Sequence, residues 1–246
     1  MAPDFDLDPQ TVLRAYASGI FPMADDRDAP GIYWVEPKLR GILPLDGFHL
    51  SRSLRKLVAS DRYRVTADQA FEDILGLCAE SASDRPETWI NGTIERAFVR
   101  LHEMGFAHSV EIWDGERLAG GLYGLALGQA FFGESMVSRA PSASKVALAW
   151  LVARLKVGGF RLLDCQFQTD HLATMGAVEI PRDAYSALLS GALGIDPAGT
   201  GLVSAAFDAL DRRGALPAGA AAPAPADTVA GPVSGKDIVQ LLGHTS

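Results

Sequence analysis

The sequence FFGESMVSRAPSASKVALAWLVARLKVGGFRLLDCQFQTDHLATMGAVEIP, residues 131–181, carries the strongest signals of secondary structure in the chain. It starts inside a strand pattern over 129–138, continues into an apolar helix pattern over 142–159, and returns to a strand pattern over 160–168. Similar alternation of short apolar runs and longer helical patterns extends toward the N-terminus. It predicts an α+β chain whose strands form one central sheet.

The flanking patterns define the kind of sheet. Asp114-Gly115 separates strand patterns at 107–114 and 117–128 and is a hairpin signal, so these strands are predicted to be antiparallel neighbours. Two short strands, interrupted by Pro37, are expected within 32–45. Helix patterns cover 7–20, 48–60, 67–81, 93–105 and 181–193. We predict a mixed, largely antiparallel sheet with helices packed on it.

Three segments are predicted along the chain. Residues 1–62 form a small N-terminal domain, 63–194 form the main domain, and 195–246 form a tail. The tail contains ALPAGAAAPAPADTVAGPVSG, which is rich in Ala, Pro and Gly and lacks hydrophobic periodicity, so we predict that it is disordered. With 246 residues, 48% of them apolar, the chain can bury one sizeable core.

Composition excludes several classes of protein. No apolar run reaches the length of about 18 residues that spans a membrane, and the N-terminus lacks a signal-peptide pattern, so a cytoplasmic protein is expected. Cys78 and Cys165 are not spaced as in a disulfide framework or a zinc cluster, and the histidines lack ligand spacing. We therefore expect no metal site.

The net charge of -8 argues against a protein that coats nucleic acid indiscriminately. Within the basic window 37–64, however, a predicted helix capped by Ser51 places Arg52, Arg55 and Lys56 opposite its apolar face. These three side chains are predicted to form a basic surface that faces solvent.

Two acidic residues stand out because they occur within apolar strand patterns. In FRLLDCQF, alternation places Leu162, Asp164 and Gln166 on one face of the strand. Glu134 follows Gly133 in the strand pattern FFGESM. A buried carboxylate costs several kcal/mol unless it is paired, so both acids are candidates for chemistry. The alternative for each is an ordinary structural carboxylate.

The loop SRAPSAS precedes a helix and resembles the cofactor site of N-acetyltransferases, in which amides and hydroxyls face a pyrophosphate. After Arg139, however, serines occupy the two glycine positions of that motif, at Ser142 and Ser144. Coenzyme A is therefore not expected as the donor.

Ser135, Asp164 and His171 occur in the order of an α/β-hydrolase triad, which makes a hydrolase an alternative. The nucleophile elbow requires a glycine where Val137 stands, and Asp164 lies too close to His171 in sequence for the usual separate loops. The pattern therefore argues against a hydrolase.

Trp34 and Trp89 lie in polar or turn-rich surroundings, YWVEP and ETWING. Each side chain either packs in the core or offers a flat surface on which a nucleotide base can stack, worth on the order of 1–3 kcal/mol per base.

Six blocks together resemble the leucyl/phenylalanyl-tRNA–protein transferases, over about residues 6 to 190. They are ASGIFPM, IYWVEPKLRGILPL, FHLSRSLRK, TWINGTIERAFVRLHEMGFAHSVEIW, LAGGLYGLALGQAFFGESMVSRAPSASKVAL and LLDCQFQTDHLATMGAVEIPRDAY. The resemblance implies an aminoacyltransferase with a small N-terminal domain and an N-acetyltransferase-like C-terminal domain. It would move Leu or Phe, with Met as a further candidate, from aminoacyl-tRNA to proteins that begin with Arg or Lys. These would then be degraded by the N-end rule, and no cofactor is implied.

The resemblance also implies roles for individual residues. Asp164 and Gln166 would be the catalytic pair, with Glu134 near the acceptor, and Trp34 and Trp89 would hold the 3′-terminal adenosine. The donor side chain would enter an apolar pocket formed by Leu122, Met136, Leu148, Leu151 and Leu163. The basic surface of Arg52, Arg55 and Lys56 would contact tRNA phosphates.

Two alternatives remain open at this point. One is a related transferase that adds Leu to acidic N-termini, and the other is a non-catalytic protein that binds tRNA or degradation signals. Tyr33-Trp34-Val35-Glu36-Pro37 replaces the Trp-Trp-Ser-Pro usual in the family.

Overall fold

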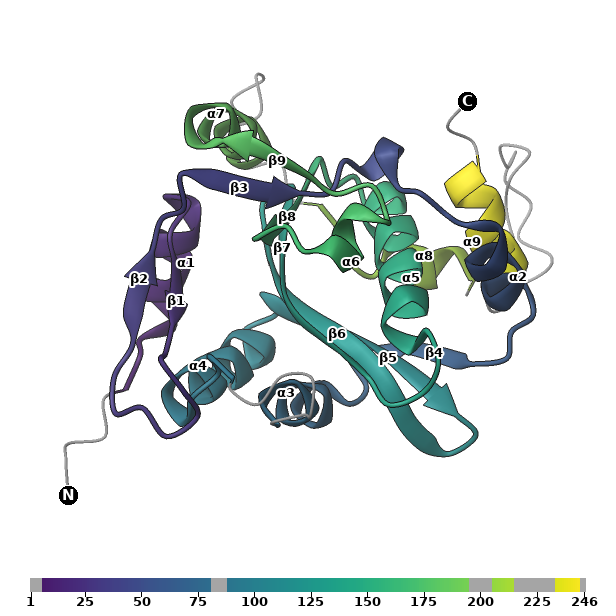
Figure 1. Cartoon of the computed structure of the whole chain (residues 1–246), viewed down its shortest axis with the longest axis horizontal. Helices are drawn as coiled ribbons and strands as arrows, with labels where there is room; N and C mark the ends of the chain where they lie inside the picture. The colour runs from purple at the N-terminus through teal and green to yellow at the C-terminus, as the bar shows by residue number, and fades with distance from the viewer. Residues whose placement is uncertain (1–5, 81–87, 195–204, 215–232, 244–246) are drawn as a thin grey trace.

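The computed structural model describes residues 6–80, 88–194, 205–214 and 233–243. These residues contain a seven-stranded sheet, with its strands in the order β4-β5-β6-β7-β8-β3-β9 (Figure 1). The strands are β3 (Leu39–Ile42), β4 (Arg64–Ala67), β5 (Ala107–Asp114), β6 (Arg117–Leu127), β7 (Ala130–Ser138), β8 (Leu162–Gln166) and β9 (Val178–Pro181). β7 and β8 are parallel and the other neighbours are antiparallel, so the predicted mixed, largely antiparallel sheet is confirmed.

Two glycines show why the centre of the sheet forms as it does. Gly115 turns the β5–β6 hairpin with a φ of 64°, a conformation that glycine adopts without steric cost. Gly124 lies where the β6–β7 register shifts, and a Cβ there would come within 2.3 Å of the Phe132 carbonyl oxygen. The close approach of the backbones therefore requires glycine at position 124.

Helices cover both faces of the sheet. On one face α1 (Pro9–Ala17), α3 (Phe71–Ala79), α4 (Gly92–Glu103) and α7 (Arg182–Leu193) share a buried apolar cluster with β6 and β7. On the other face α5 (Ala143–Val157) lies between the sheet and α2 (Arg52–Ala59), and it also packs against η1 (Leu45–Gly47). α5 is buried nearly all round because the sequence VALAWLVARL offers apolar side chains in every direction.

The first 62 residues contribute to the main sheet. β3 is hydrogen-bonded between β8 and β9, with Ile42 opposite Asp164 and Val178, while α2 packs on α5. Separate from this sheet, β1 (Phe21–Met23) and β2 (Tyr33–Val35) form a two-stranded sheet at one side of the molecule. The predicted division at residue 62 does not coincide with a break in packing.

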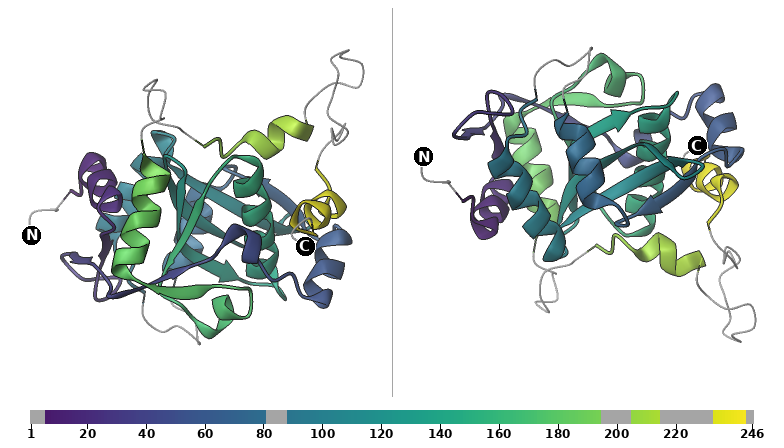
Figure 2. Two further views of the ribbon diagram at one scale, coloured as in Figure 1. Left: turned by 90° about the horizontal axis from the view of Figure 1, so that it is seen from above. Right: turned by 90° about the horizontal axis from the view of Figure 1, so that it is seen from below.

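Two segments of the predicted tail, 205–214 and 233–243, belong to the described residues. These residues form α8 (Ala209–Gly214) and α9 (Gly235–Gly243), and α9 packs against α2 and α5 (Figure 2). Ile238 and Leu242 are buried, and the Gly235 amide donates to Asp61 Oδ1 at 2.6 Å. Most of α9 comes from KDIVQLLG, which follows the Ala/Pro-rich stretch, and α2 and α5 cover its apolar side chains. The rest of the tail lies outside the described residues.

Over the same described residues, no helix is both long and apolar enough to cross a membrane. Nor does that part of the chain bring together three His, Cys, Asp or Glu side chains as a metal site would require.

Candidate functional site

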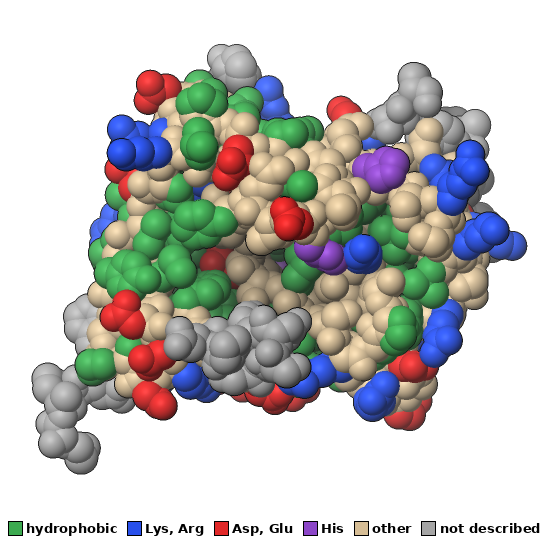
Figure 3. Space-filling model, viewed as in Figure 1, with side chains coloured by type: hydrophobic (Ala, Val, Ile, Leu, Met, Phe, Trp, Pro, Cys, Tyr) green, Lys and Arg blue, Asp and Glu red, His purple; other side chains and the backbone are tan. Residues whose placement is uncertain are grey.

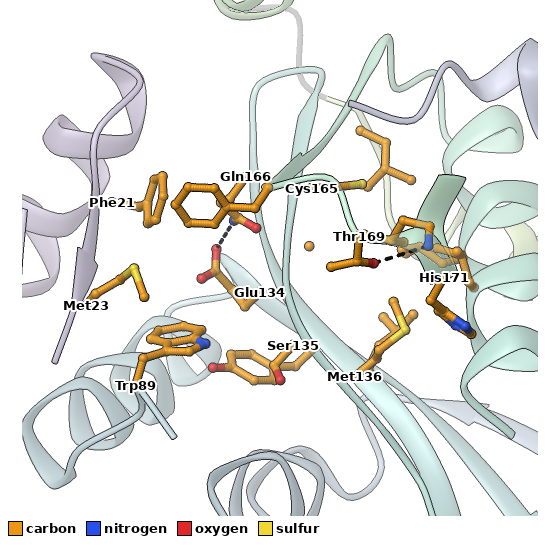
Figure 4. A pocket seen from close by; sticks show the side chains of 18 residues that line it. Phe21, Met23, Trp89, Glu134, Ser135, Met136, Cys165, Gln166, Thr169 and His171 are labelled. Carbon is orange, nitrogen blue, oxygen red and sulfur yellow. Dashed lines mark hydrogen bonds between the residues drawn. The ribbon is translucent and has the colours of Figure 1, made fainter. Parts of the chain in front are cut away.

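A cavity of about 320 Å³ lies between the two-stranded sheet, β7, β8 and α5 (Figure 4). Every member of the predicted apolar pocket lines it, namely Leu122, Met136, Leu148, Leu151 and Leu163. Glu134, Gln166 and Trp89 line it as well. The space-filling view shows hydrophobic side chains gathered on this face of the molecule, over the two-stranded sheet (Figure 3). The structure therefore combines apolar walls with two polar groups.

Glu134 and Gln166 point toward one another across the middle of the cavity. The Gln166 Nε2 donates a hydrogen bond to Glu134 Oε1 at 3.1 Å. Burial raises the pKa of the Glu134 carboxyl to about 8, and the nearby Asp164 charge adds to the rise, whereas Tyr16, Arg40 and Gln166 limit it. Glu134 is therefore mostly protonated at neutral pH and becomes a base as the pH passes through 8.

Gln166 reaches the cavity because the backbone leaves the strand conformation at this residue. Its φ is 55°, a left-handed value that is unfavourable for a side chain with a Cβ. The Gln166 amide donates to Asp164 Oδ1 at 2.8 Å, which holds the turn. On the neighbouring strand a Cβ at Gly41 would lie 2.7 Å from the Phe167 carbonyl carbon, so glycine makes room for the turning chain.

Strand alternation alone predicted that Asp164 and Gln166 would share a face, and this requires correction. Leu163, Cys165 and Gln166 line the cavity, whereas Asp164 is fully buried outside it. The left-handed backbone at Gln166 interrupts the alternation. The Gln166 side chain therefore turns toward the cavity that Leu163 and Cys165 also face. Burial also raises the pKa of the Cys165 thiol, which keeps it protonated.

Asp164 is held by three separate groups. Arg40 donates from Nε to Oδ1 at 2.9 Å and from Nη2 to Oδ2 at 2.6 Å, and the Tyr185 hydroxyl donates to Oδ2 at 2.6 Å. Together with the Gln166 backbone amide, these donors occupy both carboxylate oxygens. Burial, together with the Asp164 charge, raises the pKa of Tyr185 far above its ordinary value, so this hydroxyl stays a donor. Asp164 is thus arranged to hold its neighbours in place.

Arg40 itself is 1% exposed and is enclosed on all sides. Its guanidinium carbon lies 4.6 Å from the ring centre of Phe21 and 4.5 Å from that of Tyr185, and its Nη1 donates to the Gly19 carbonyl at 3.0 Å. Burial disfavours the charged form, but the hydrogen bonds to Asp164 outweigh it, so the Arg40 pKa is raised. The guanidinium therefore ties β3, the N-terminal segment and β8 together.

Several residues of the site escaped the sequence analysis. Arg40 and Tyr185 complete the Asp164 cluster, while Phe21, Met23 and Phe167 line the cavity. A lone arginine in LRGIL was a usable signal, because such a residue in an apolar strand needs a buried partner. Met23 and Phe167 carried no comparable signal.

The two predicted stacking residues have different positions. Trp89 lines the cavity on the same side as Phe21 and Met23. Trp34 is 40% exposed on β2 and does not line the cavity. Because Trp34 pairs with Pro22, its side chain lies on the face of the two-stranded sheet opposite to Phe21 and Met23.

The predicted basic surface is present on α2. Ser51 Oγ accepts a hydrogen bond from the Leu54 amide at 3.3 Å, which caps the helix as predicted. Arg52, Arg55 and Lys56 are exposed, and among the described residues none of them has a carboxylate at ion-pair distance. Lys and Arg side chains line the same edge of the molecule in Figure 3, over α2 and α9.

The chain matches a family model described as "Leucyl/phenylalanyl-tRNA protein transferase" over residues 42–190 and the N-terminal domain model of that family over 5–38. It is similar to a leucyl/phenylalanyl-tRNA–protein transferase of Rhizorhabdus wittichii, with 58% identity over 98% of this chain and 99% of the relative. A Zymomonas mobilis relative of the same name is 63% identical over 76% of this chain and 70% of its own length.

Among solved structures, the chain resembles "The structure of L-PGS from Bacillus licheniformis" with a TM-score of 0.37 and 14% sequence identity. The likeness covers 65% of this chain and 53% of that chain. We draw nothing from a likeness this distant.

Proposed function

This chain belongs to the leucyl/phenylalanyl-tRNA–protein transferase family, and we propose that the cavity around Glu134 and Gln166 is its active site. The enzyme is an aminoacyltransferase that moves Leu or Phe from aminoacyl-tRNA to a protein. The observation that carries the proposal is the hydrogen-bonded pair of Glu134 and Gln166 inside a cavity whose walls are mostly apolar.

In this proposal the two parts of the donor, its amino-acid side chain and its adenosine, lie on opposite sides of the Glu134–Gln166 pair. The donor's Leu, Phe or Met side chain enters the apolar wall that includes Leu122, Met136 and Leu148, where the flexible Met136 adapts to either shape. The 3′-terminal adenosine lies beside Trp89 and Met23 on the opposite side. The ester bond is then adjacent to the two polar groups. Trp34, outside the cavity, is not assigned to this adenosine.

The reaction is aminolysis of an ester that is already activated, so the residues need only position the reactants and move one proton. The acceptor's neutral α-amine attacks the carbonyl carbon, an amide bond forms, and the bond to the ribose oxygen breaks. Gln166 donates to Glu134 through Nε2, so the Gln166 Oε1 is free to accept a hydrogen bond from the amine. Glu134 receives the proton that the amine loses, and the departing ribose oxygen takes up a proton.

The acceptor is a protein with N-terminal Arg or Lys, which the transfer marks for degradation by the N-end rule. A cationic side chain near Glu134 would favour the ionised carboxylate and lower its raised pKa. Binding of such an acceptor would therefore generate the base at neutral pH. An acidic N-terminus would have the opposite effect.

The tRNA body lies against α2 in this proposal, through Arg52, Arg55 and Lys56. Replacing all three with Ala should weaken tRNA binding and lower the slope of log K against log salt by roughly 2–3. Arg117→Ala, in the exposed β5–β6 hairpin, is the control with one cation removed elsewhere. An unchanged salt slope in the triple variant would refute the placement.

The parallel pair β7–β8, joined through α5 in an otherwise antiparallel sheet, also leads us to propose an N-acetyltransferase-like fold for the main domain. An experimental structure with bound donor would test both the topology and the ligand's position.

The experiment that tests the function uses radiolabelled Leu-tRNA and peptides that differ only in their first residue. Transfer to Arg and Lys peptides, and not to Asp or Glu peptides, is expected. Transfer to acidic N-termini would replace the acceptor rule, and no transfer at all would refute the catalytic proposal in favour of a binding protein.

A further inference from the structure

A second cavity, of about 500 Å³, adjoins the first. The two cavities share Met136 and His171, which lie on the side of the first cavity opposite to Phe21 and Met23. The second cavity is lined by more charged and hydroxyl-bearing side chains than the first, beside the apolar Leu77, Met136 and Val137. It includes Arg139, Lys145 and the hydroxyl-bearing residues Ser138, Ser142 and Ser144.

The charges around the second cavity favour an anion. Lys145 is half-buried and takes part in no ion pair within the described part of the chain, and it faces His171, whose pKa it lowers together with burial. Arg139 contributes a second cation, which forms an ion pair with Glu80, a carboxylate that also lines the cavity. His171 Nε2 is buried and has no hydrogen-bond partner among the described residues. The Ser142 and Ser144 hydroxyls add further donors, whereas the Ser138 hydroxyl already donates to the Ala140 carbonyl at 3.0 Å.

The second cavity also has a defined place relative to the basic helix. The loop that follows β7 lines the cavity, and the Pro141 carbonyl of this loop accepts a hydrogen bond from the Tyr63 hydroxyl at 3.0 Å. Tyr63 comes four positions after the end of α2. The cavity therefore lies on the α2 side of the first cavity.

We propose that the second cavity binds a backbone phosphate of the single-stranded 3′ end of the donor tRNA, through Lys145 and Arg139. The donor strand would leave the adenosine beside Trp89, cross the mouth of the first cavity to the side lined by Met136 and His171, and there reach these two cations on its way toward α2. The inference rests on the proposed function, because it assumes an aminoacylated nucleotide in the first cavity. A phosphate suits the site because charge-assisted hydrogen bonds from Lys, Arg and hydroxyl groups satisfy its oxygens.

Short donors of increasing length isolate the phosphate contact. Phe-adenosine carries no phosphate, whereas the aminoacylated CA dinucleotide and CCA trinucleotide carry one and two internal phosphates. For the unmodified enzyme, kcat/KM should rise with the first or second phosphate. Lys145→Met and Arg139→Met should each reduce this rise about tenfold, and should leave kcat/KM for Phe-adenosine unchanged.

The matched control is Arg161→Met. Arg161 is exposed and follows the C-terminal end of α5, so it lies at the other end of the helix from Ser142 and Ser144. This variant should behave like the unmodified enzyme with every donor. Equal losses with and without phosphate in Lys145→Met and Arg139→Met would overturn the inference.

A binding measurement separates this inference from the proposed function. Calorimetric titration with CCA trinucleotide that carries no amino acid, and with adenosine, measures binding without the transfer reaction. Lys145→Met should weaken CCA binding about tenfold and leave adenosine binding unchanged, and equal affinities of CCA for both proteins would refute the phosphate site. Absence of transfer from every donor, with this difference in binding intact, would instead refute the proposed reaction alone.

Discussion

Two carboxylates on adjacent strands of the sheet have opposite surroundings. Asp164 is fully buried and receives hydrogen bonds from Arg40, Tyr185 and the Gln166 amide. Glu134 lines an open cavity and receives one from the Gln166 side chain. A carboxylate whose oxygens are all occupied fixes the positions of its neighbours, whereas one with spare acceptor capacity and a raised pKa can exchange a proton.

The largest effect is expected in the closed cluster. Asp164→Asn removes the charge that pairs with buried Arg40, so the free energy of unfolding should fall by about 3–5 kcal/mol. Transfer should fall as well, because the weakened contact with Arg40 no longer fixes the oxygen that accepts from the Gln166 backbone amide. Urea unfolding and transfer assays measure the two effects.

A second variant distinguishes positioning from simple loss of stability. Combining Arg40→Met with Asp164→Leu removes both buried charges, and should recover much of the lost stability. Transfer should stay low, because Leu offers no acceptor to the Gln166 amide. A stable double variant with normal transfer would show that Asp164 does not position Gln166.

The open pair should respond differently. Glu134→Gln is expected to lower kcat for transfer about 100-fold, since it removes the proposed proton acceptor, while the protein stays folded. A kcat within threefold of the unmodified enzyme would exclude this role. Gln166→Glu is not a suitable control, because it adds a second carboxylate beside the first.

The raised pKa of Glu134 predicts a pH effect of known sign. The folded state holds a proton on Glu134 up to a pH of about 8, whereas the unfolded chain loses it near the ordinary value of 4.5. Stability from this group is therefore present at low pH and is lost as the pH rises from 4.5 through 8. At pH 8, Glu134→Gln should be more stable than the unmodified protein by on the order of 4 kcal/mol.

Direct titration provides the check on that prediction. The chemical shift of the Glu134 side-chain carboxyl, followed by carbon NMR, should titrate with a midpoint near 8 and move lower when an Arg-starting peptide binds. A midpoint near 4.5 without peptide would contradict the role of burial.

The aromatic side of the open cavity should contribute a smaller effect. Trp89→Ala is expected to raise KM for aminoacyl-tRNA about tenfold through lost base stacking. Trp34→Ala is the matched control outside the cavity, and its KM should change less than threefold. Equal effects of both substitutions would restore Trp34 to the adenosine site.

The smallest effect is expected at the edge of the closed cluster. Tyr185→Phe removes one of the hydrogen bonds to Asp164 but leaves the Arg40 ion pair, so stability should fall by about 1–2 kcal/mol. Transfer should fall by a few-fold. A loss as large as that of Asp164→Asn would mean that the hydroxyl, and not the guanidinium, is the main partner of Asp164.

Local sequence patterns were enough to predict much of the fold. Hydrophobic periodicity and the Asp114-Gly115 turn predicted the central strands and the helices that cover them, because these depend on local patterns. Burial of an acid among apolar residues singled out Asp164 and Glu134, and helix periodicity predicted which face of α2 carries its cations.

The remaining features became visible only in the tertiary structure, because they depend on contacts between residues far apart in sequence. Arg40 lies 124 positions before Asp164, and no local pattern states that they pair. This pairing also holds the left-handed backbone at Gln166, which places the Gln166 side chain on the strand face opposite to the one that alternation predicted. Likewise, α9 forms where α2 and α5 cover its apolar side chains. The apolar strand patterns marked both acids as candidates, and long-range packing places Asp164 in a closed cluster and Glu134 at the cavity.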